Sequence, residues 1–359
     1  MDRHDFLDLL PGPIGRLARA SYHRLLTLAQ SGYQRIYAAT EHRRPGPLPP
    51  PLRSTERALL RSLPLDTTAV VATYPAAGQV LGTLRRQERL HIPVITYLTD
   101  FSVHALWVAH GVDLHLAVHE IPAGQAREQG AAAVTVTGPV VDRRFSPSTN
   151  SQRRAARERF GLPANAPLAL LVAGSWGVGP VRRAAAEIRD SGAAVPVVVC
   201  GRNQTLAKQL RADGIEHAFG WTDDMPGLMY ACDVLVQNAG GLTSLEAFSC
   251  GLPVVSYRCI PGHGQTNAAA LHEAGLAPWV REPADLKPIL TELTEGLRAH
   301  RQRQAGLACT VMRQDRPRSS PPPPVVAPRP PCPRPYFPRR VATRAASPAA
   351  SPQPSHPHS

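Results

Sequence analysis

Three glycine-rich stretches in the second half of the sequence have the composition of an anion-binding site. They are VAGSWGVG (172–179), NAGGLTSLE (238–246) and CIPGHGQTN (259–267), and each follows an apolar run and precedes a helical pattern. Glycine-rich turns free backbone N–H groups, and a helix N-terminus favours negative charge, so such corners suit a diphosphate. The first stretch has neither the GKS or GKT of a P-loop nor the acidic partner of a dinucleotide fingerprint. Taken alone, it is equally consistent with an ordinary strand-to-helix turn.

The corner at 238–246 allows two interpretations. If Thr243 is the N-cap of a helix, Glu246 three residues later completes a capping box, which satisfies N–H groups at the helix start. That interpretation leaves the preceding AGG and the third stretch unexplained. Together, the three corners offer backbone donors for a diphosphate, a carboxylate for ribose hydroxyls and amides for sugar hydroxyls. The set therefore favours a nucleotide-sugar site.

A second group of residues could supply acid–base chemistry. The stretch TDFSVHALW places Asp100 at the end of an apolar run, with His104 and Trp107 three residues apart, as on one helical face. Transfer of a group to a hydroxyl requires a base that takes the hydroxyl proton, and histidine or aspartate can serve. A helix cap at Asp100 and an interface role for His104 and Trp107 explain the same pattern equally well.

The elements that must position these residues follow a strand–helix alternation. Short apolar runs predict strands at 68–75, 92–100, 112–120 and 132–141, and again at 167–174, 194–201, 231–238 and 252–257. Helical patterns follow many of them, which predicts parallel sheets with crossover helices. We expect an α/β fold with an N-terminal domain (1–145), a linker (146–165), a second domain (166–312) and a disordered Pro/Arg-rich tail (313–359). The segment 1–40 is expected to be helical and 43–52 a loop.

Composition narrows the function classes. The net charge is +13, but from residue 313 onward eight arginines and one aspartate account for more than half of it, which argues against a nucleic-acid surface. The six cysteines form no CxxC pair and indicate reduced thiols of a cytoplasmic protein. No apolar run approaches the roughly 20 residues of a transmembrane helix, and the start does not resemble a secretory signal.

Residues 231–275 resemble the donor-site signature of glycosyltransferase family 28. In the first half, DFLDLLP, ATYPAAG and TYLTDFSVHALWV are similar to acceptor-domain segments of the monogalactosyldiacylglycerol synthase branch. The family also includes the peptidoglycan lipid-intermediate N-acetylglucosaminyltransferases. The resemblance covers about residues 5–312 and implies the GT-B architecture, with two doubly wound parallel-sheet domains facing a cleft.

The resemblance also implies roles for individual residues. The donor-side residues are Gly174, Ser175, Gly241, Leu242, Thr243, Glu246, Gln265 and Asn267. The first two lie beside the donor diphosphate, and the next three form a turn that presents N–H groups to it. Glu246 holds the ribose hydroxyls, and the last two lie near the donor sugar. On the acceptor side, Asp100 and His104 are the candidates for the catalytic base.

The sequence departs from the family pattern at both ends. DFLDLLP lies almost at Met1, where the family has already passed its first strand and a glycine-rich loop that bears histidine. At the other end, relatives finish with helix and this sequence has a Pro/Arg tail. We therefore expect a family member that is truncated at its start, with reduced activity and stability.

The expected function is transfer of galactose, glucose or N-acetylglucosamine from a UDP-sugar to a lipid acceptor such as diacylglycerol, with inversion. No Asp-x-Asp motif is present, so we expect no metal and no cofactor, the UDP-sugar being a co-substrate. The partners are the donor and a lipid at a membrane surface, with no nucleic acid. The expected location is the cytoplasm, peripheral on the inner face of the cell membrane, with residues 13–30 as an interfacial helix. A UDP-N-acetylglucosamine 2-epimerase and a non-catalytic nucleotide-binding remnant are the alternatives.

Overall fold

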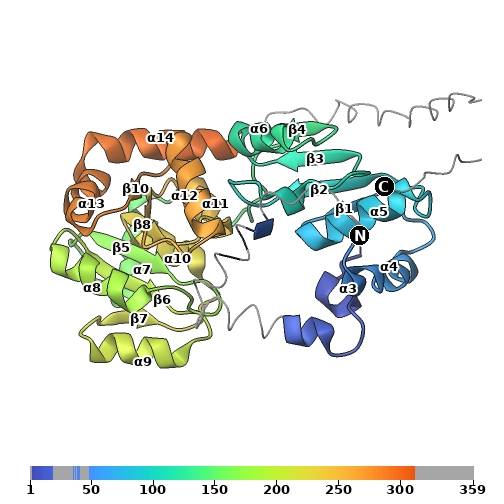
Figure 1. Cartoon of the computed structure of the whole chain (residues 1–359). Coiled ribbons are helices and arrows are strands. Elements are labelled where there is room, and N and C mark those ends of the chain that lie inside the picture. Colours follow the sequence, from blue (N-terminus) through green and yellow to red (C-terminus); the bar gives the residue numbers. More distant parts are fainter. Residues whose placement is uncertain (1, 19–34, 36, 38, 41–47, 312–359) are drawn as a thin grey trace, which may run out of the picture. The chain divides into compact units, whose positions relative to one another are not determined.

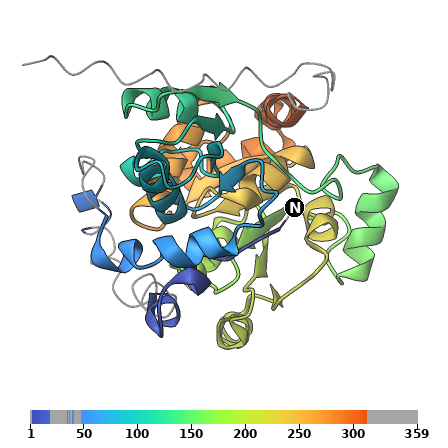
Figure 2. The same cartoon turned by 90° about the vertical axis from the view of Figure 1, so that its right-hand side faces the viewer.

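The computed structural model describes residues 2–18, 35, 37, 39–40 and 48–311. The described residues contain two parallel β-sheets with crossover helices (Figures 1 and 2). The predicted tail at 313–359 lies outside the described residues. So does most of the helix expected around 13–30, of which residues 14–18 are described and helical.

The first sheet has four parallel strands in the order β1-β2-β3-β4. The strands are β1 (Val70–Ala72), β2 (Val94–Leu98), β3 (Leu114–Ala117) and β4 (Val134–Val136). Helix α5 (Pro75–Arg86) connects β1 to β2, η2 (Ala105–Trp107) lies between β2 and β3, and α6 (Glu120–Glu128) connects β3 to β4. Because the described strands follow sequence order, the strand order does not reverse within the described part of this sheet.

The helices that precede the first strand in the described part of the chain include η1 (Phe6–Leu9), α3 (Pro50–Arg53) and α4 (Glu56–Ser62). The loop expected at 43–52 therefore ends earlier than predicted, because α3 begins at Pro50, where a proline in the first turn costs no hydrogen bond. Residues 41–47 lie outside the described part of the chain. Leu59 of α4 packs with Val80, Leu81 and Leu84 of α5 in the core of this domain.

The second sheet has six parallel strands in the order β10-β9-β8-β5-β6-β7. They are β5 (Leu168–Val172), β6 (Val195–Val199), β7 (His217–Phe219), β8 (Val234–Gln237), β9 (Val254–Tyr257) and β10 (Trp279–Val280). Counted from β7, this is the 3-2-1-4-5-6 order of a doubly wound fold. The order reverses between β5 and β8, where the following loops diverge and leave a crevice for a ligand.

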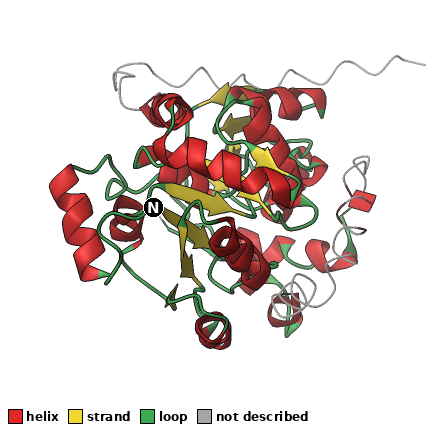
Figure 3. Ribbon diagram, turned by 90° about the vertical axis from the view of Figure 1, so that its left-hand side faces the viewer, coloured by secondary structure: helices red, strands yellow, loops and turns green. Residues whose placement is uncertain are grey.

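Helices surround the strands of the second sheet (Figure 3). They are α8 (Val181–Ser191), α9 (Gln204–Ala212), α10 (Met225–Ala231), α11 (Leu242–Ser249), α12 (His263–Glu273), η3 (Pro283–Asp285), α13 (Leu286–Glu295) and α14 (Leu297–Val311). Alternate residues of β5 point to opposite faces: Leu168 and Leu170 join one buried cluster, and Ala169 and Leu171 join another. Both faces are therefore apolar, which explains the continuous hydrophobic runs.

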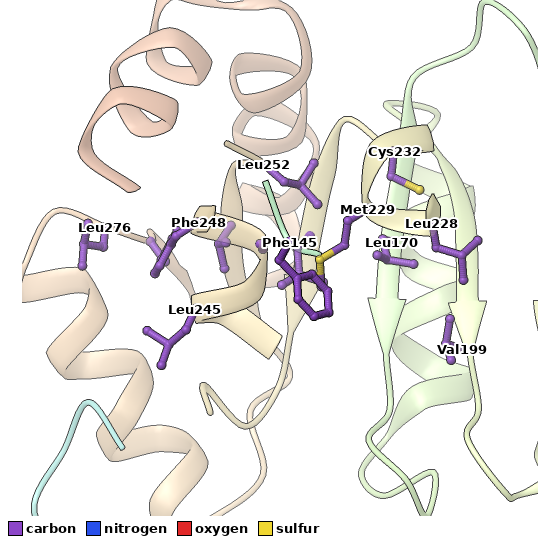
Figure 4. Close-up of a cluster of buried hydrophobic side chains, with 14 of the residues drawn as sticks. Phe145, Leu170, Val199, Leu228, Met229, Cys232, Leu245, Phe248, Leu252 and Leu276 are labelled. Carbon is purple, nitrogen blue, oxygen red and sulfur yellow. The ribbon is translucent and has the colours of Figure 1, made fainter. Parts of the chain in front are cut away.

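The first of these clusters packs α10 and α11 onto the sheet. Leu245 and Phe248 project from α11, and Leu170 and Val199 belong to strands β5 and β6 (Figure 4). Phe248 is fully buried and also lies against Gly306 of α14, where a methyl group would come within 2.9 Å of the ring. This packing fixes the start of α11, which borders the crevice.

The segment expected as a linker, 146–165, contains helix α7 (Asn150–Arg159). Its start carries a complete capping box between Thr149 and Gln152. Arg157 is buried and donates to one oxygen of Asp233 at 2.8 Å, and the other oxygen of Asp233 pairs with Arg153. Because Asp233 stands just before β8, this network fastens α7 to the second sheet.

All eight strands predicted from the apolar runs are present. The sequence analysis did not predict β7 and β10, which have three and two residues and lie at the two edges of the second sheet. Edge strands this short contribute too few apolar residues to give a recognisable pattern.

Candidate functional site

A pocket of about 220 Å³ opens at the point where the strand order of the second sheet reverses. It is lined by the loops that follow β5 and β8, together with the first turn of α11. Four of the predicted donor-side residues line it: Gly174, Ser175, Gly241 and Thr243. Doubly wound sheets bind their ligands at this position, so the pocket is the candidate site.

At two positions in these loops, both the backbone conformation and the lack of space exclude residues other than glycine. Gly179 and Gly240 have φ angles of 99° and 74°, which side chains other than glycine rarely adopt. A β-carbon on Gly240 would lie 2.6 Å from that of Asn267, and one on Gly179 would lie 2.6 Å from the amide nitrogen of Asn238. The loops therefore approach one another too closely for any side chain.

Hydrogen bonds join the three glycine-rich loops into one unit. The Asn238 side chain donates to the Val178 carbonyl at 3.0 Å, and the Asn238 carbonyl accepts from the Ile260 N–H at 2.9 Å. The Asn267 side chain donates to the Ala239 carbonyl at 3.0 Å. The three stretches singled out in the sequence thus meet around one pocket wall.

Helix α11 begins at Leu242, with Gly241 as its N-cap and no side-chain cap. The capping box predicted for Thr243 and Glu246 is therefore wrong, because Thr243 already lies inside the first helical turn. The first N–H groups of a helix have no carbonyl one turn earlier to accept from them, and the first turn of α11 borders the pocket; of these groups, the Ser244 N–H donates to the Gly241 carbonyl at 3.0 Å. Thr243 lines the pocket, whereas the side chain of Leu242 is 56% exposed. The uncapped helix start can bind an anion.

Glu246 lies one turn further along α11 and is not among the residues that line the pocket. Burial raises the pKa of Glu246 to about 7, and the nearby Asp142 carboxylate adds to the rise while Arg144 opposes it. Glu246 therefore changes charge near neutral pH. As an ionised group, it can accept hydrogen bonds from hydroxyls of a ligand that extends beyond the pocket.

Gln265 and Asn267 lie in the first turn and a half of α12, but their environments differ. Gln265 is partly exposed, whereas Asn267 is fully buried. Besides Ala239, the Asn267 amide contacts Ser102, accepting from its backbone N–H at 2.8 Å and from its hydroxyl at 3.0 Å. The Asn267 amide also stabilises the ionised form of Asp100 and so lowers the pKa of that carboxyl group. Asn267 thus connects the segment after β2 to the loop after β8.

Asp100 follows β2 and lies near the N-cap of α11. A β-carbon placed on Gly241 would lie 4.0 Å from its Oδ1. The side chain keeps a partial opening to solvent, but the surrounding atoms desolvate the carboxyl group. This desolvation raises the pKa of Asp100 to about 6, against the lowering effect of the Asn267 hydrogen bond. Asp100 is therefore largely ionised at neutral pH and basic enough to accept a proton.

His104 has a different role in the structure. Its Nδ1 accepts from the Leu106 N–H at 3.1 Å, which makes His104 the N-cap of η2. Its Nε2 lies 3.2 Å from the Thr40 hydroxyl and 3.1 Å from the Tyr37 carbonyl. Both ring nitrogens therefore have protein partners, and Trp107 is buried in the neighbouring apolar cluster. Of the two predicted bases, Asp100 is the one that borders the second-domain loops.

The pocket wall includes residues to which the sequence analysis assigned no role, among them the polar Gln237 and Ser244. A polar residue at the end of the apolar strand VLVQ was the available signal for Gln237. Ser244 gave no signal, because serine in the first turn of a helix is common. Beyond the pocket, the Arg202 guanidinium stacks on the Trp221 ring at 4.9 Å, where the loops after β6 and β7 meet.

Within the described part of the chain, no group of three or more histidine, cysteine, aspartate or glutamate side chains is placed to hold a metal ion. The described helices include none that is long and apolar enough to span a membrane.

Comparisons with known proteins extend these observations. Residues 4–141 match the family model of monogalactosyldiacylglycerol (MGDG) synthase, and residues 173–287 match that of the glycosyl transferases group 1. The processive diacylglycerol β-glucosyltransferase of Bacillus cytotoxicus is 27% identical over 226 residues. That of Bacillus cereus (strain AH187) is 28% identical over 234 residues. Each alignment covers 60% of this chain and 57% of the relative, so the chain spans less than two thirds of these relatives.

Among solved structures, Anabaena HepE in complex with UDP superimposes with a TM-score of 0.50 and 18% identity. The match covers 74% of this chain and 78% of HepE. At this identity the likeness shows the fold, which is the GT-B architecture predicted from the sequence. The chain therefore has the GT-B architecture, and its residues 4–141 are similar to the monogalactosyldiacylglycerol synthase family, the resemblance noted in the sequence.

Proposed function

We propose that this chain is a glycosyltransferase that moves a hexose from a UDP-sugar to a lipid acceptor such as diacylglycerol, with inversion at the anomeric carbon. The observation that carries the proposal is the pocket at the switch point of the second sheet, with the Asp100 carboxyl group beside the N-cap of α11. The matched family and the names of the relatives support the chemistry.

In this proposal, the loops after β5 and β8 hold the donor diphosphate. Gly174 and Ser175 lie on one side, and Gly241, Leu242 and Thr243 present the N-terminus of α11 on the other. As the leaving group departs, negative charge accumulates on the diphosphate. Fixed N–H dipoles aimed at that charge stabilise the transition state without rearranging.

Asp100 acts as the general base. Its ionised carboxylate takes the proton of the acceptor hydroxyl while the hydroxyl oxygen attacks the anomeric carbon. The bond between that carbon and the phosphate oxygen breaks, and the electron pair leaves with UDP. Glu246 accepts hydrogen bonds from the ribose hydroxyls, and Gln265 lies toward the donor sugar. His104 acts indirectly, because it caps η2 in the segment that follows Asp100.

Glucose is the favoured sugar, with galactose and N-acetylglucosamine as the other candidates, because the relatives are named β-glucosyltransferases. A lipid acceptor implies that the protein meets its substrate at a membrane surface, from a peripheral position.

The test is sugar transfer in mixed micelles. We expect glycosylated diacylglycerol and free UDP from UDP-glucose, and neither product when diacylglycerol is left out. A UDP-sugar that changes without an acceptor would indicate an epimerase. UDP binding without turnover on any of the three sugars would indicate a non-catalytic nucleotide-binding protein.

A further inference from the structure

Two buried side chains of the pocket wall each carry an oxygen atom that lacks a hydrogen-bond partner among the described residues. Ser244 is fully buried and Gln237 is 3% exposed, and both line the pocket. Neither the Ser244 Oγ nor the Gln237 Oε1 has a hydrogen-bond partner among the residues that the structure describes. A buried polar atom without a partner destabilises a protein, and nearly all such atoms in native proteins are satisfied. Two of them in one pocket wall point to a ligand that satisfies both.

The Ser244 hydroxyl has no evident structural purpose. Its backbone N–H already donates to the Gly241 carbonyl at 3.0 Å, so the backbone of the first turn is held without it. A helical serine often bonds a carbonyl one turn back, as Ser249 does with Leu245 at 3.0 Å in the same helix. Ser244 makes no such bond, and an alanine would fill the site without burying an unpaired group.

Gln237 is held at one end and unpaired at the other. Its Nε2 lies 2.5 Å from the Ser256 hydroxyl on the neighbouring strand, which anchors the amide. A hydroxyl can donate as well as accept, so the amide can turn over and keep this contact. The turned amide carries an N–H group in place of the unpaired oxygen. The Gln237 amide can therefore act either as a hydrogen-bond acceptor or as a hydrogen-bond donor to the ligand.

The lack of basic side chains among the described residues that line the pocket indicates how a ligand must be bound there. Among the described residues that line it, none is lysine, arginine or histidine. A diphosphate bound there has no cationic side chain in the wall to meet its charge, so neutral N–H and O–H donors must serve. The glycine-rich backbone supplies N–H donors. Among the buried side chains that line the pocket, Ser244 and Gln237 have polar groups that are not already hydrogen-bonded.

We propose that the Ser244 hydroxyl and the Gln237 amide bind non-bridging oxygens of the donor diphosphate. This inference rests on the proposed function, because it takes the ligand to be a UDP-sugar. It adds two side-chain donors to a site otherwise built from backbone N–H groups. It also explains why polar groups are retained where apolar ones would be more stable.

The decisive variant is Ser244→Ala, with Ser249→Ala as the matched control on the same helix. UDP affinity is measured by calorimetry, and the stability of the unliganded protein by urea unfolding. We expect Ser244→Ala to weaken UDP binding roughly tenfold, the loss typical of one hydrogen bond to a charged group. The unliganded variant should be as stable as the wild type or more stable, because an unpaired hydroxyl is removed. Ser249→Ala should leave UDP affinity unchanged.

Binding of uridine, which carries no phosphate, tests whether Ser244 contacts the diphosphate or the nucleoside. Uridine should bind the wild type and Ser244→Ala equally, and an equal loss for uridine and UDP would overturn the assignment to the diphosphate. Unchanged UDP affinity, with a less stable unliganded variant, would mean that the hydroxyl holds a structural water. Gln237→Met provides a second variant, judged by UDP affinity alone because Ser256 loses its partner. If the wild type itself fails to bind UDP, the proposed function fails first, and this inference with it.

Discussion

Replacing Asp100 by asparagine should lower activity and raise stability at neutral pH. Burial raises the pKa of Asp100 from its ordinary value of 3.8 to about 6. The native state therefore binds this proton more tightly than the unfolded chain does, and ionisation of Asp100 favours unfolding. The stability that the protonated carboxyl provides is complete below pH 3.8 and is lost as the pH rises to about 6.

The expected magnitude follows from the same shift. A difference of about 2 pKa units corresponds to about 3 kcal/mol in the free energy of unfolding at neutral pH. Asparagine has no charge to desolvate, and its side-chain oxygen can still accept a hydrogen bond from Asn267. We therefore expect Asp100→Asn to be more stable than the wild type by up to that amount at about pH 7.5, with the difference disappearing near pH 4. Sugar transfer should fall by roughly 10²–10⁴-fold, the usual contribution of a general base.

Urea unfolding at both pH values, together with the micelle transfer assay, measures the two effects. Asp66→Asn is the matched control, because Asp66 is an exposed carboxylate in the same domain and should change neither quantity. Transfer that stays above about a tenth of the wild-type rate would show that another group takes the proton. An unchanged free energy of unfolding at neutral pH would show that the carboxyl group is better solvated than its surroundings indicate.

Three other substitutions test the site. Asn267→Ala should lower the free energy of unfolding by about 2–5 kcal/mol, because buried groups lose their partners. It should also move the acid limb of the pH–rate profile to higher pH, because the lost hydrogen bond no longer lowers the pKa of Asp100. Gly240→Ala should lower the free energy of unfolding, measured in urea, by more than Gly275→Ala does. Both glycines have positive φ, but of the two only Gly240 has a neighbour within 4 Å of the added methyl group. Glu246→Gln should weaken UDP binding by roughly 1–3 kcal/mol. Calorimetry should show wild-type affinity rising as the pH increases through about 7, and no such rise in the variant.

The sequence predicts the strands well because both faces of the second sheet are buried. Runs such as LALLV are apolar at every position and leave little ambiguity. The start of α11 was harder to predict, because Thr243 and Glu246 have the spacing of a capping box. The structure places the N-cap two residues earlier, at Gly241, and the helix starts at Leu242. Gly240 and Gly241 provide the turn there, so the helix needs no side-chain cap. The local pattern was read correctly as a helix start, but the backbone path set by the glycines decided where it begins.

The site residues show what sequence patterns cannot predict. Spacing placed Gly174, Ser175, Gly241 and Thr243 at strand ends, and the structure brings these four to one pocket. The role of Asn267 could not be interpreted this way, because its partner Ser102 lies 165 residues earlier in the chain, after a strand of the other sheet. Sequence patterns report the neighbours along a helix or strand. Which distant backbone groups need a partner becomes visible only once the chain is folded.

Most of the hydrogen-bonding capacity of Asn267 is already used within the protein. An asparagine amide has two acceptor sites and two donor hydrogens. The Ser102 N–H and hydroxyl occupy the acceptor sites, the Ala239 carbonyl takes one donor, and the amide also lowers the pKa of the Asp100 carboxyl group. A direct contact with the donor sugar would have to break one of these bonds inside a buried site. The amide instead holds the proposed base and the proposed diphosphate loop at a fixed separation. Because attack at the anomeric carbon requires both groups to be in place at once, we expect Asn267 to contribute to the proposed transfer by positioning, and the partly exposed Gln265 to meet the sugar hydroxyls.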